Sequence, residues 1–411
     1  MLSRKVSGAE LTVMFTLYTG ATSGIGLYLF PSMVIAVQRD IAFSYRTLGT
    51  ITALVQASYM ACALGAGVLA ARLGAMRMIL AANALCAVAL GVMALSSNVA
   101  MLAACLTVLG GCSAASWVPM AQVIQNHVSP QHRGKAHSLI VSGTAYGVLV
   151  NSVLLTCLLP GHGWRALCAA ACGLVGALAL LGFVRLRGLG GMEARQACVR
   201  AEPAARSAQL PFKLAAATVL LMFFLGLATS PFQVYLSAFL EQQARYPAYV
   251  SAYAWRIIGV AGMGFGLAMG TLADRMTLRH GMTITCFALA GSCLSLLGAR
   301  DASNHLPAYA AAALFGASYY SIYGLTAAYI GHLYAPRHAA LVFALGNVAV
   351  GLGGIAGNIL GGALKARSGS FEPVYLLIFG AAAGAALVSL ALPSDRASVS
   401  RLPATGRVQG T

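Results

Sequence analysis

The chain has 411 residues, of which 59% are hydrophobic and only 9% are charged. Because soluble domains carry about 25% charged residues, this composition excludes a soluble globular protein and indicates a membrane protein. The formal net charge is +17. In a membrane protein such a charge reflects lysine and arginine held on the cytoplasmic side, so we expect no nucleic-acid partner.

Apolar stretches long enough to cross a lipid bilayer follow one another along the whole chain. A spanning helix needs about 20 apolar residues, and the sequence predicts twelve such helices. They lie at residues 10–36, 47–70, 77–96, 99–125, 137–160, 164–185, 213–240, 248–271, 281–299, 307–332, 339–364 and 373–392. Arg4 and Lys5 precede the first stretch and no small-residue cleavage site follows it. We therefore predict an uncleaved first helix rather than a signal peptide.

A polar linker between Arg185 and Lys213 divides the predicted helices into two sets of six. The sequence thus predicts an all-α membrane protein with four parts. These are an N-terminal six-helix half at 1–186, a cytoplasmic linker at 187–212, a C-terminal six-helix half at 213–392 and a cytoplasmic tail at 393–411.

The two halves also share sequence features at a nearly constant spacing. The segment from Gly67 to Arg72 reads GVLAAR, and 203 positions later the segment from Gly270 to Arg275 reads GTLADR. A second pair of features, Arg133 with Gly147 and Arg337 with Gly351, is offset by 204 positions. Internal repeats of about half the chain length are typical of secondary transporters.

Both copies of this segment resemble the loop motif of the major facilitator superfamily, G-x-x-x-D-R followed by basic residues. The resemblance covers residues 10–392. It implies a fold of two six-helix halves, alternating-access transport without enzymatic activity, and a loop that acts as a latch on one gate. The gating-loop residues would be Gly67, Arg72, Gly74 and Arg77 in the first copy and Gly270, Asp274, Arg275 and Arg279 in the second. The first copy has Ala71 at the acidic position. The turn at Gly163-Trp164-Arg165 also resembles the family, and we expect Trp164 to be an interfacial anchor.

Arg256 is the cation that the helix prediction places inside a span. It lies about eight residues, or roughly 12 Å, from the outer end of the helix at 248–271. An ionised side chain at that depth costs up to about 3 kcal/mol and usually faces a water-filled cavity. Alternatively, the long side chain snorkels to the outer headgroups. Both interpretations remain open at this point.

Polar and aromatic residues on the predicted cavity helices form the remaining set of substrate-binding candidates. Aromatic rings with a polar tip suit an amphipathic or ring-bearing ligand, although some of these residues would instead bond neighbouring helices. With Arg256, the candidates are Trp255, Tyr18, Tyr28, Gln56, Tyr59, Trp117, Gln233, Tyr320, Tyr323 and Asn347, together with Tyr319.

The sequence leaves two classes of substrate open for a small-molecule carrier in the bilayer. Arg256 and the lack of mid-span acids favour a small organic anion, whereas the aromatic content favours export of an amphipathic drug-like or siderophore-like molecule. No mid-span carboxylate marks the coupling ion, for which a proton is one candidate. The sequence has no H-E-x-x-H, G-x-S-x-G or C-x-x-C pattern. We therefore expect no catalytic set, no metal and no cofactor, and we expect a monomer in the bacterial inner membrane.

Topology follows from the distribution of lysine and arginine. With the N-terminus in the cytoplasm, the cytoplasmic segments hold eighteen of the 26 basic residues and the outer segments hold seven, with Arg256 inside a span. This asymmetry predicts that both termini are cytoplasmic. A reporter fused near Arg200 in the linker is expected to read cytoplasmic, and a periplasmic signal there would overturn the helix assignment.

Overall fold

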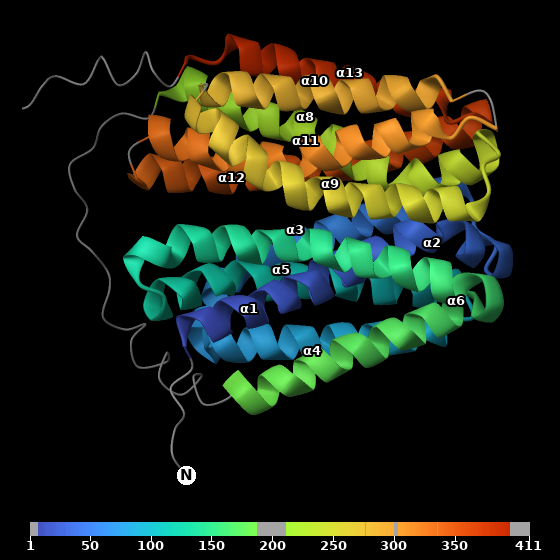
Figure 1. Cartoon of the computed structure of the whole chain (residues 1–411), viewed down its shortest axis with the longest axis horizontal. Coiled ribbons are helices and arrows are strands. Elements are labelled where there is room, and N and C mark those ends of the chain that lie inside the picture. The colour runs from blue at the N-terminus through green and yellow to red at the C-terminus, as the bar shows by residue number, and fades with distance from the viewer. Residues whose placement is uncertain (1–6, 187–210, 276, 300–302, 335, 395–411) are drawn as a thin grey trace, which may run out of the picture.

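The structure is a computed structural model in which the helices lie side by side as two bundles (Figure 1). It describes residues 7–186, 211–275, 277–299, 303–334 and 336–394, without the side chains of 71, 130, 134, 266–275, 336 and 337. The first bundle contains α1 (Gly8–Thr19), η1 (Gly20–Ile25), α2 (Gly26–Asp40), α3 (Tyr45–Leu73), α4 (Ala75–Ala94), α5 (Val99–His127) and α6 (Pro130–Leu186). The second contains α8 (Phe212–Ala238), η2 (Phe239–Gln243), α9 (Ala248–Arg275), α10 (Leu278–Leu297), α11 (Leu306–Leu333), α12 (Pro336–Ser368) and α13 (Glu372–Ala391).

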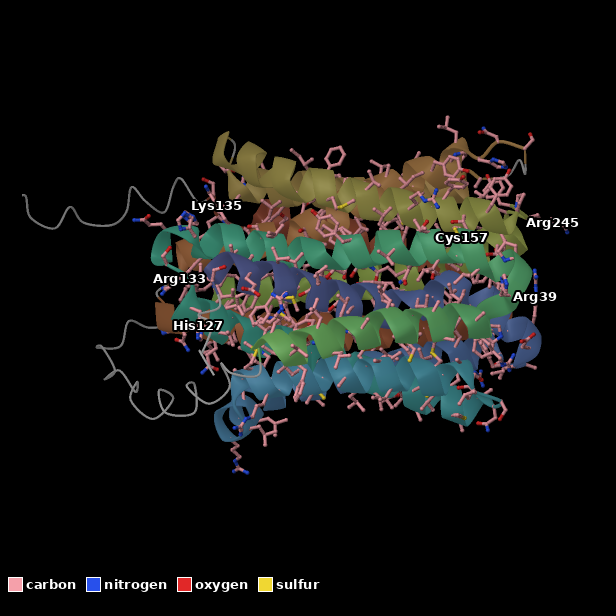
Figure 2. All side chains as sticks on the ribbon, turned by 60° about the horizontal axis from the view of Figure 1, so that its bottom comes forward. Arg39, His127, Arg133, Lys135, Cys157 and Arg245 are labelled. Atoms are coloured by element: carbon pink, nitrogen blue, oxygen red, sulfur yellow. The ribbon has the colours of Figure 1, made fainter. Side chains whose placement is uncertain are left out.

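These bounds confirm the all-α prediction and extend most of the predicted helices by a few residues. Within the described residues, nine helical segments are long and apolar enough to cross a membrane. The count of twelve and the division at 187–212 stay predictions, because residues 187–210 lie outside the description. We call the end of the bundles that carries Leu186 and Phe212 the linker end and the opposite end the far end. Arg133 and Lys135 lie at the linker end, and Arg39 and Arg245 at the far end (Figure 2).

Polar side chains at the helix starts explain where several helices begin. Ser7 accepts a hydrogen bond from the backbone N–H of Glu10 at 3.1 Å, and Ser44 caps α3 through the N–H of Thr47 in the same way. Asn98 caps α5 through the N–H of Met101 at 2.9 Å. Such caps satisfy backbone donors that have no partner within the helix, and these donors are costly to leave unpaired near lipid.

The prediction separated two helices between residues 160 and 164, and α6 (Pro130–Leu186) is indeed two helical arms that meet at the non-helical backbone of Gly163. Gly163 has φ of 73°, a left-handed conformation that glycine adopts without steric cost. The bend brings Trp164 and Arg165 to Asp40, which accepts hydrogen bonds from the indole N–H at 2.8 Å and from the guanidinium at 2.6 Å. Trp164 is only 2% exposed. The buried indole of Trp164 therefore links the start of the second arm of α6 to the half-exposed Asp40 at the end of α2.

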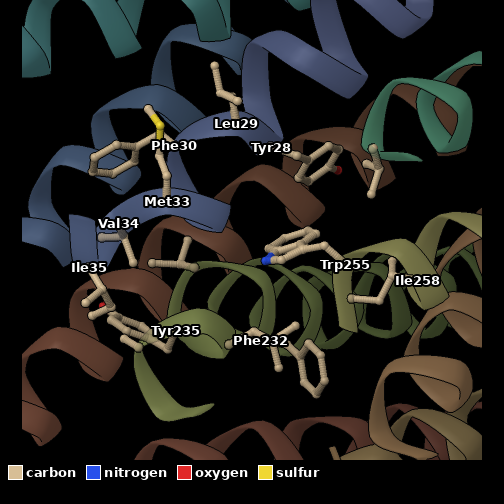
Figure 3. Packing of buried hydrophobic residues seen from close by; sticks show 14 of the residues in the cluster. Tyr28, Leu29, Phe30, Met33, Val34, Ile35, Phe232, Tyr235, Trp255 and Ile258 are labelled. Atoms are coloured by element: carbon tan, nitrogen blue, oxygen red, sulfur yellow. The ribbon is translucent and has the colours of Figure 1, made fainter. Parts of the chain in front are cut away.

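The apolar cores show how the two bundles are joined. One core cluster contains residues of both bundles, among them Tyr28 and Met33 of α2 with Phe232 of α8 and Trp255 of α9 (Figure 3). The other clusters each belong to one bundle: Phe15 and Ile79 are in one of them, and Leu221 and Met282 in another. These single-bundle clusters include residues near the linker end. The bundles therefore share a core toward the far end and have separate cores toward the linker end.

Close approach of two backbones fixes the contact of η1 with α6. A Cβ added to Gly147 would lie 2.2 Å from the carbonyl oxygen of Gly20 and 2.6 Å from the Cα of Gly24. Asn151 donates to the carbonyl of Gly24 at 2.9 Å, which satisfies an acceptor in the π-helical turn. In lipid, where burial of apolar area gives no drive, such packing is the main source of helix association.

Substitution of Gly147 by alanine should therefore be destabilising, because the added methyl group meets backbone atoms that cannot move aside. We expect a loss of about 1–3 kcal/mol, as for other overpacked sites. Gly173→Ala is the matched control, because a Cβ at Gly173 meets nothing within 4 Å and alanine favours a helix by about 0.5–1 kcal/mol. Thermal unfolding of both purified variants tests the contact, and equal melting temperatures would contradict it.

Candidate functional site

Two tyrosine hydroxyls meet across the bundles near the middle of the shared core. Tyr28 of α2 and Tyr319 of α11 lie 2.6 Å apart, oxygen to oxygen, and either can donate. Tyr28 is 8% exposed and Tyr319 is half-buried. This pair joins residues 291 positions apart, so it depends on the relative placement of the two bundles.

Trp255 of α9 lies beside this pair (Figure 3). Its ring centre is 6.1 Å from that of Tyr28, and its indole N–H donates to the hydroxyl of Ser237 at 2.9 Å. The side chain is 1% exposed, and its polar atom is fully used. In this conformation the ring of Trp255 packs beside that of Tyr28, and its N–H is not available to a ligand because it is bonded to Ser237.

A stripe of rings on α11 leads away from the tyrosine pair. Phe315, Tyr319 and Tyr323 follow one another at four-residue spacing, which puts them on one helix face. The rings of Phe315 and Tyr319 stack at 5.4 Å, and Phe315 stacks in turn on Phe232 of α8 at 4.0 Å. Beyond Tyr319, the hydroxyl of Tyr323 lies 3.0 Å from that of Thr229. Tyr320 leaves this stripe and lies over α9, where a Cβ on Gly262 would be 2.1 Å from its ring.

Arg256 lies in the seam where α6 packs against α9. Its guanidinium donates to the hydroxyls of Ser152 at 3.2 Å and Thr156 at 2.9 Å, both on α6, and lies 4.7 Å from the ring centre of Tyr253. Ser152 also donates to the backbone carbonyl of Ala252 at 2.7 Å. Arg256 therefore ties one bundle to the other through neutral partners, and no carboxylate among the described residues lies within ion-pair distance of it.

The opposite seam is formed by α3 and α12 and is close-packed at glycines. A Cβ on Gly354 would lie 3.2 Å from the side chain of Gln56, and one on Gly351 would lie 3.0 Å from the sulfur of Met60. Nearer the far end, a Cβ on Gly49 would lie 2.3 Å from the carbonyl oxygen of Asn358. Gln56 thus lies in the seam, with one face toward α12.

Polar side chains connect the bundles at the far end. Gln242 of η2 donates to Gln38 of α2 at 3.3 Å and accepts a hydrogen bond from the hydroxyl of Tyr45. A pocket of about 390 Å³ lies among these residues, and Arg39 and Glu241 line it from opposite bundles. Hydrogen bonds therefore join the two bundles at the far end, beyond the shared core.

The remaining substrate-binding candidates do not form one group. Tyr18 is fully buried, and its hydroxyl occupies the space that a side chain on Gly182 would need. Trp117 packs against the ring of His137 at 5.4 Å, nearer the linker end. Gln233 and Tyr59 lie near Tyr319. Asn347 is exposed and donates to the backbone carbonyl of Phe343 on its own helix.

The gating-loop candidates lie at the linker end, and only part of the second loop can be placed. Gly74 has φ of 89° and separates α3 from α4, while Gly67, Arg72 and Arg77 are exposed. Gly270 lies on the last part of α9, and the side chains of Asp274 and Arg275 lie outside the description. Arg279 donates to the backbone carbonyl of Leu392 at 3.2 Å, so it anchors the start of α10 on the end of α13.

The sequence pattern indicated Tyr319 only as one of several aromatic candidates. It did not predict the ring partners of Tyr319 or the hydroxyls that bind Arg256. The four-residue spacing from Phe315 to Tyr323 is a signal that could have identified the stripe. Ser152 and Thr156 gave no such signal, because serine and threonine are common in spanning helices and their partner lies about 100 positions away.

The sequence and the structure were compared with known proteins. The model of the Major Facilitator Superfamily matches residues 13–357, whereas none of the curated protein sequences matches the chain. A crystal structure of a variant of the nucleoside transporter NupG is similar, with 14% identity, 93% of this chain and 99% of that chain covered, and a TM-score of 0.69. A crystal structure of a bacterial homologue of the human lysosomal transporter Spinster, in an inward-facing and unoccupied conformation, is also similar. It has 12% identity, 95% of this chain and 98% of that chain are covered, and the TM-score is 0.69.

Removal of the Ser152 hydroxyl should loosen the α6–α9 seam, because it deletes one bond to Arg256 and one to Ala252. We expect Ser152→Ala to accelerate labelling of a cysteine at Ser32 roughly thirtyfold from the far end, since the two hydrogen bonds contribute about 1 kcal/mol each. Ser32 is buried on α2, and its backbone carbonyl faces Ser237 of α8 between the bundles. The background carries Cys157→Ser, because Cys157 is exposed. Ser142→Ala is the control, as Ser142 bonds only within its own helix, and equal rates in the two variants would contradict the role of the seam.

Proposed function

The chain belongs to the major facilitator superfamily and is a membrane transporter, and we propose that it carries a small ring-bearing, amphipathic molecule by alternating access. The observation that carries this proposal is the group of rings and hydroxyls around Tyr28 and Tyr319, at the place where the bundles meet. Tyr323 and Gln233 add polar atoms to the same group.

The chemistry of this group favours a largely uncharged ring system. Aromatic faces bind flat apolar surface by stacking, and phenolic hydroxyls both donate and accept hydrogen bonds, so they can orient a polar substituent. The hydrogen bonds and ring contacts of Tyr28, Tyr319 and Tyr323 involve no charged side chain among the described residues. A ligand with a full charge would be poorly compensated there.

The arrangement of the cores supports alternating access. The bundles share an apolar core toward the far end and keep separate cores toward the linker end, which is the pattern expected when the far end is closed. In this conformation a substrate would reach the tyrosine group from the linker end. We propose that the opposite state breaks the Tyr28–Tyr319 and Gln38–Gln242 bonds, since both join the bundles.

A specific observation favours a second candidate, a small organic anion. The guanidinium of Arg256 carries a full charge with neutral partners in the α6–α9 seam. If the far end opened, Ser152 and Thr156 would move away with α6, and a substrate carboxylate would be a better partner than water for the planar fork of arginine. In this alternative Arg256 binds the anion only in the far-end-open state. A proton is the coupling ion that we propose for either substrate.

The ring-bearing candidate is tested by uptake into proteoliposomes with a panel of neutral aromatic and heterocyclic solutes. Tyr319→Phe keeps the ring but removes the hydroxyl, so we expect KM for a transported solute to rise about five- to tenfold with kcat nearly unchanged, as for one lost hydrogen bond. Tyr309→Phe on the same helix, away from the tyrosine group, is the control. A KM unchanged in both variants would count against the tyrosine site.

The anion candidate makes a different prediction for the same assay. Arg256→Gln should abolish transport of organic anions, whereas neutral solutes should still be transported, at a rate changed only by the loosened α6–α9 seam. Arg256→Lys should be intermediate for anions, because lysine keeps the charge but loses the bidentate geometry. If Arg256→Gln transports anions as the parent does, the anion candidate fails.

A further inference from the structure

A groove of about 680 Å³ lies between α4 and the second arm of α6, on the outside of the first bundle. Arg77 lines the groove, and the remaining residues of its lining are apolar; they include Ala84 and Ala87 of α4 and Leu180 and Phe183 of α6. Leu180 and Phe183 are 65% and 51% exposed. In a membrane protein such a face meets lipid rather than water, so the groove holds hydrocarbon unless another protein segment covers it.

The groove has the depth of one lipid leaflet. Arg77 and Ala87 are ten residues apart on α4, which corresponds to about 15 Å along the helix axis, or half of the roughly 30 Å hydrocarbon core. Near Ala87 the two helices approach each other closely: a Cβ on Gly176 would lie 3.8 Å from the Cβ of Ala87. The groove therefore begins at the membrane surface of the linker end and narrows near the middle of the bilayer.

Arg77 supplies a charge where a lipid headgroup would lie. Arg77 is exposed at the start of α4, and its side chain makes no hydrogen bond or ion pair with the described residues. Glu10, a described acid at the same end, is already paired with Arg185 at 3.2 Å. A basic residue at the mouth of an apolar groove between membrane helices matches the charge and shape of an anionic phospholipid.

We propose that this groove binds one anionic phospholipid, with an acyl chain between α4 and α6 and the headgroup phosphate on Arg77. A small-residue floor, provided by Ala84 and Gly176, lets a flexible chain lie close to both helix backbones. The site is separate from the tyrosine group and from both seams between the bundles. It would hold the outer helices of the first bundle together with a ligand drawn from the bilayer.

Native mass spectrometry of the purified protein with added phosphatidylglycerol or phosphatidylcholine tests the headgroup contact. One phosphatidylglycerol should bind about fivefold more tightly than phosphatidylcholine, since a basic residue near the membrane surface contributes about that factor. Arg77→Gln should remove this preference and leave phosphatidylcholine binding unchanged. Lys135→Gln is the control, because Lys135 is exposed at the same end but does not line the groove. Equal binding of both lipids to the parent, or an unchanged preference in Arg77→Gln, would overturn the contact.

Ala84→Phe tests the groove itself by filling it. Binding of both lipids should fall at least fivefold, whereas Leu85→Phe, one residue along on the same exposed helix, should bind them as the parent does. Both substitutions are at exposed positions, and a melting temperature like that of the parent verifies that each variant folds. Unchanged lipid binding in Ala84→Phe would overturn the proposal. So would a lipid-free parent with the mass of two chains that Ala84→Phe turns into single chains, because a second copy would then occupy the groove.

Discussion

Close packing of helix backbones without help from the hydrophobic effect is the constraint on which this structure depends. Lipid tails are as apolar as leucine, so helices associate only where their surfaces fit closely or share hydrogen bonds. Gly20 and Gly147 bring η1 against α6, and Gly354 does the same for the seam of α3 with α12. Tyr28 and Tyr319 meet in the core that the two bundles share.

The two bundles meet through hydrogen bonds as well as through close packing. The hydrogen bonds between them are few and join mostly neutral groups, such as Tyr28 with Tyr319 and Ser152 with Ala252. Individual bonds of this type contribute about 1 kcal/mol, so a few of them bias an equilibrium between two arrangements without fixing it. Close glycine contacts lie within a bundle, as at Gly147 with Gly20, and also between the bundles, as at Gly49 with Asn358. The halves can move as units only if the contacts of a seam separate together.

For either proposed substrate, Arg256 lies in a seam between the bundles that would have to open. In the described conformation its charge is compensated by hydroxyl dipoles and the face of Tyr253. Cation–π and hydroxyl contacts of this kind stabilise a guanidinium less than a carboxylate does. The residue is therefore well suited to exchange partners when the seam opens, whether or not an anion is the cargo. The tyrosine group, by contrast, holds its hydrogen bonds among neutral atoms and suits a neutral ring.

The sequence alone determined the fold class, the approximate helix bounds and the glycine-rich contacts, because apolar length and small-residue spacing are local properties of the chain. It also placed Arg256 inside a span, from its depth alone, and left open whether the side chain faces a cavity or snorkels. Only the tertiary structure decided which candidates come together. Tyr18 and Tyr28 are on the same span, yet one is enclosed by Gly182 and the other meets Tyr319. The π-helical turn at Gly20–Ile25 lies between them and shifts the helix faces that a 3.6-residue period would assign. The partners of Tyr28 and Arg256 lie 100 or more positions away, and such distant pairings are set by how the bundles pack rather than by any local pattern.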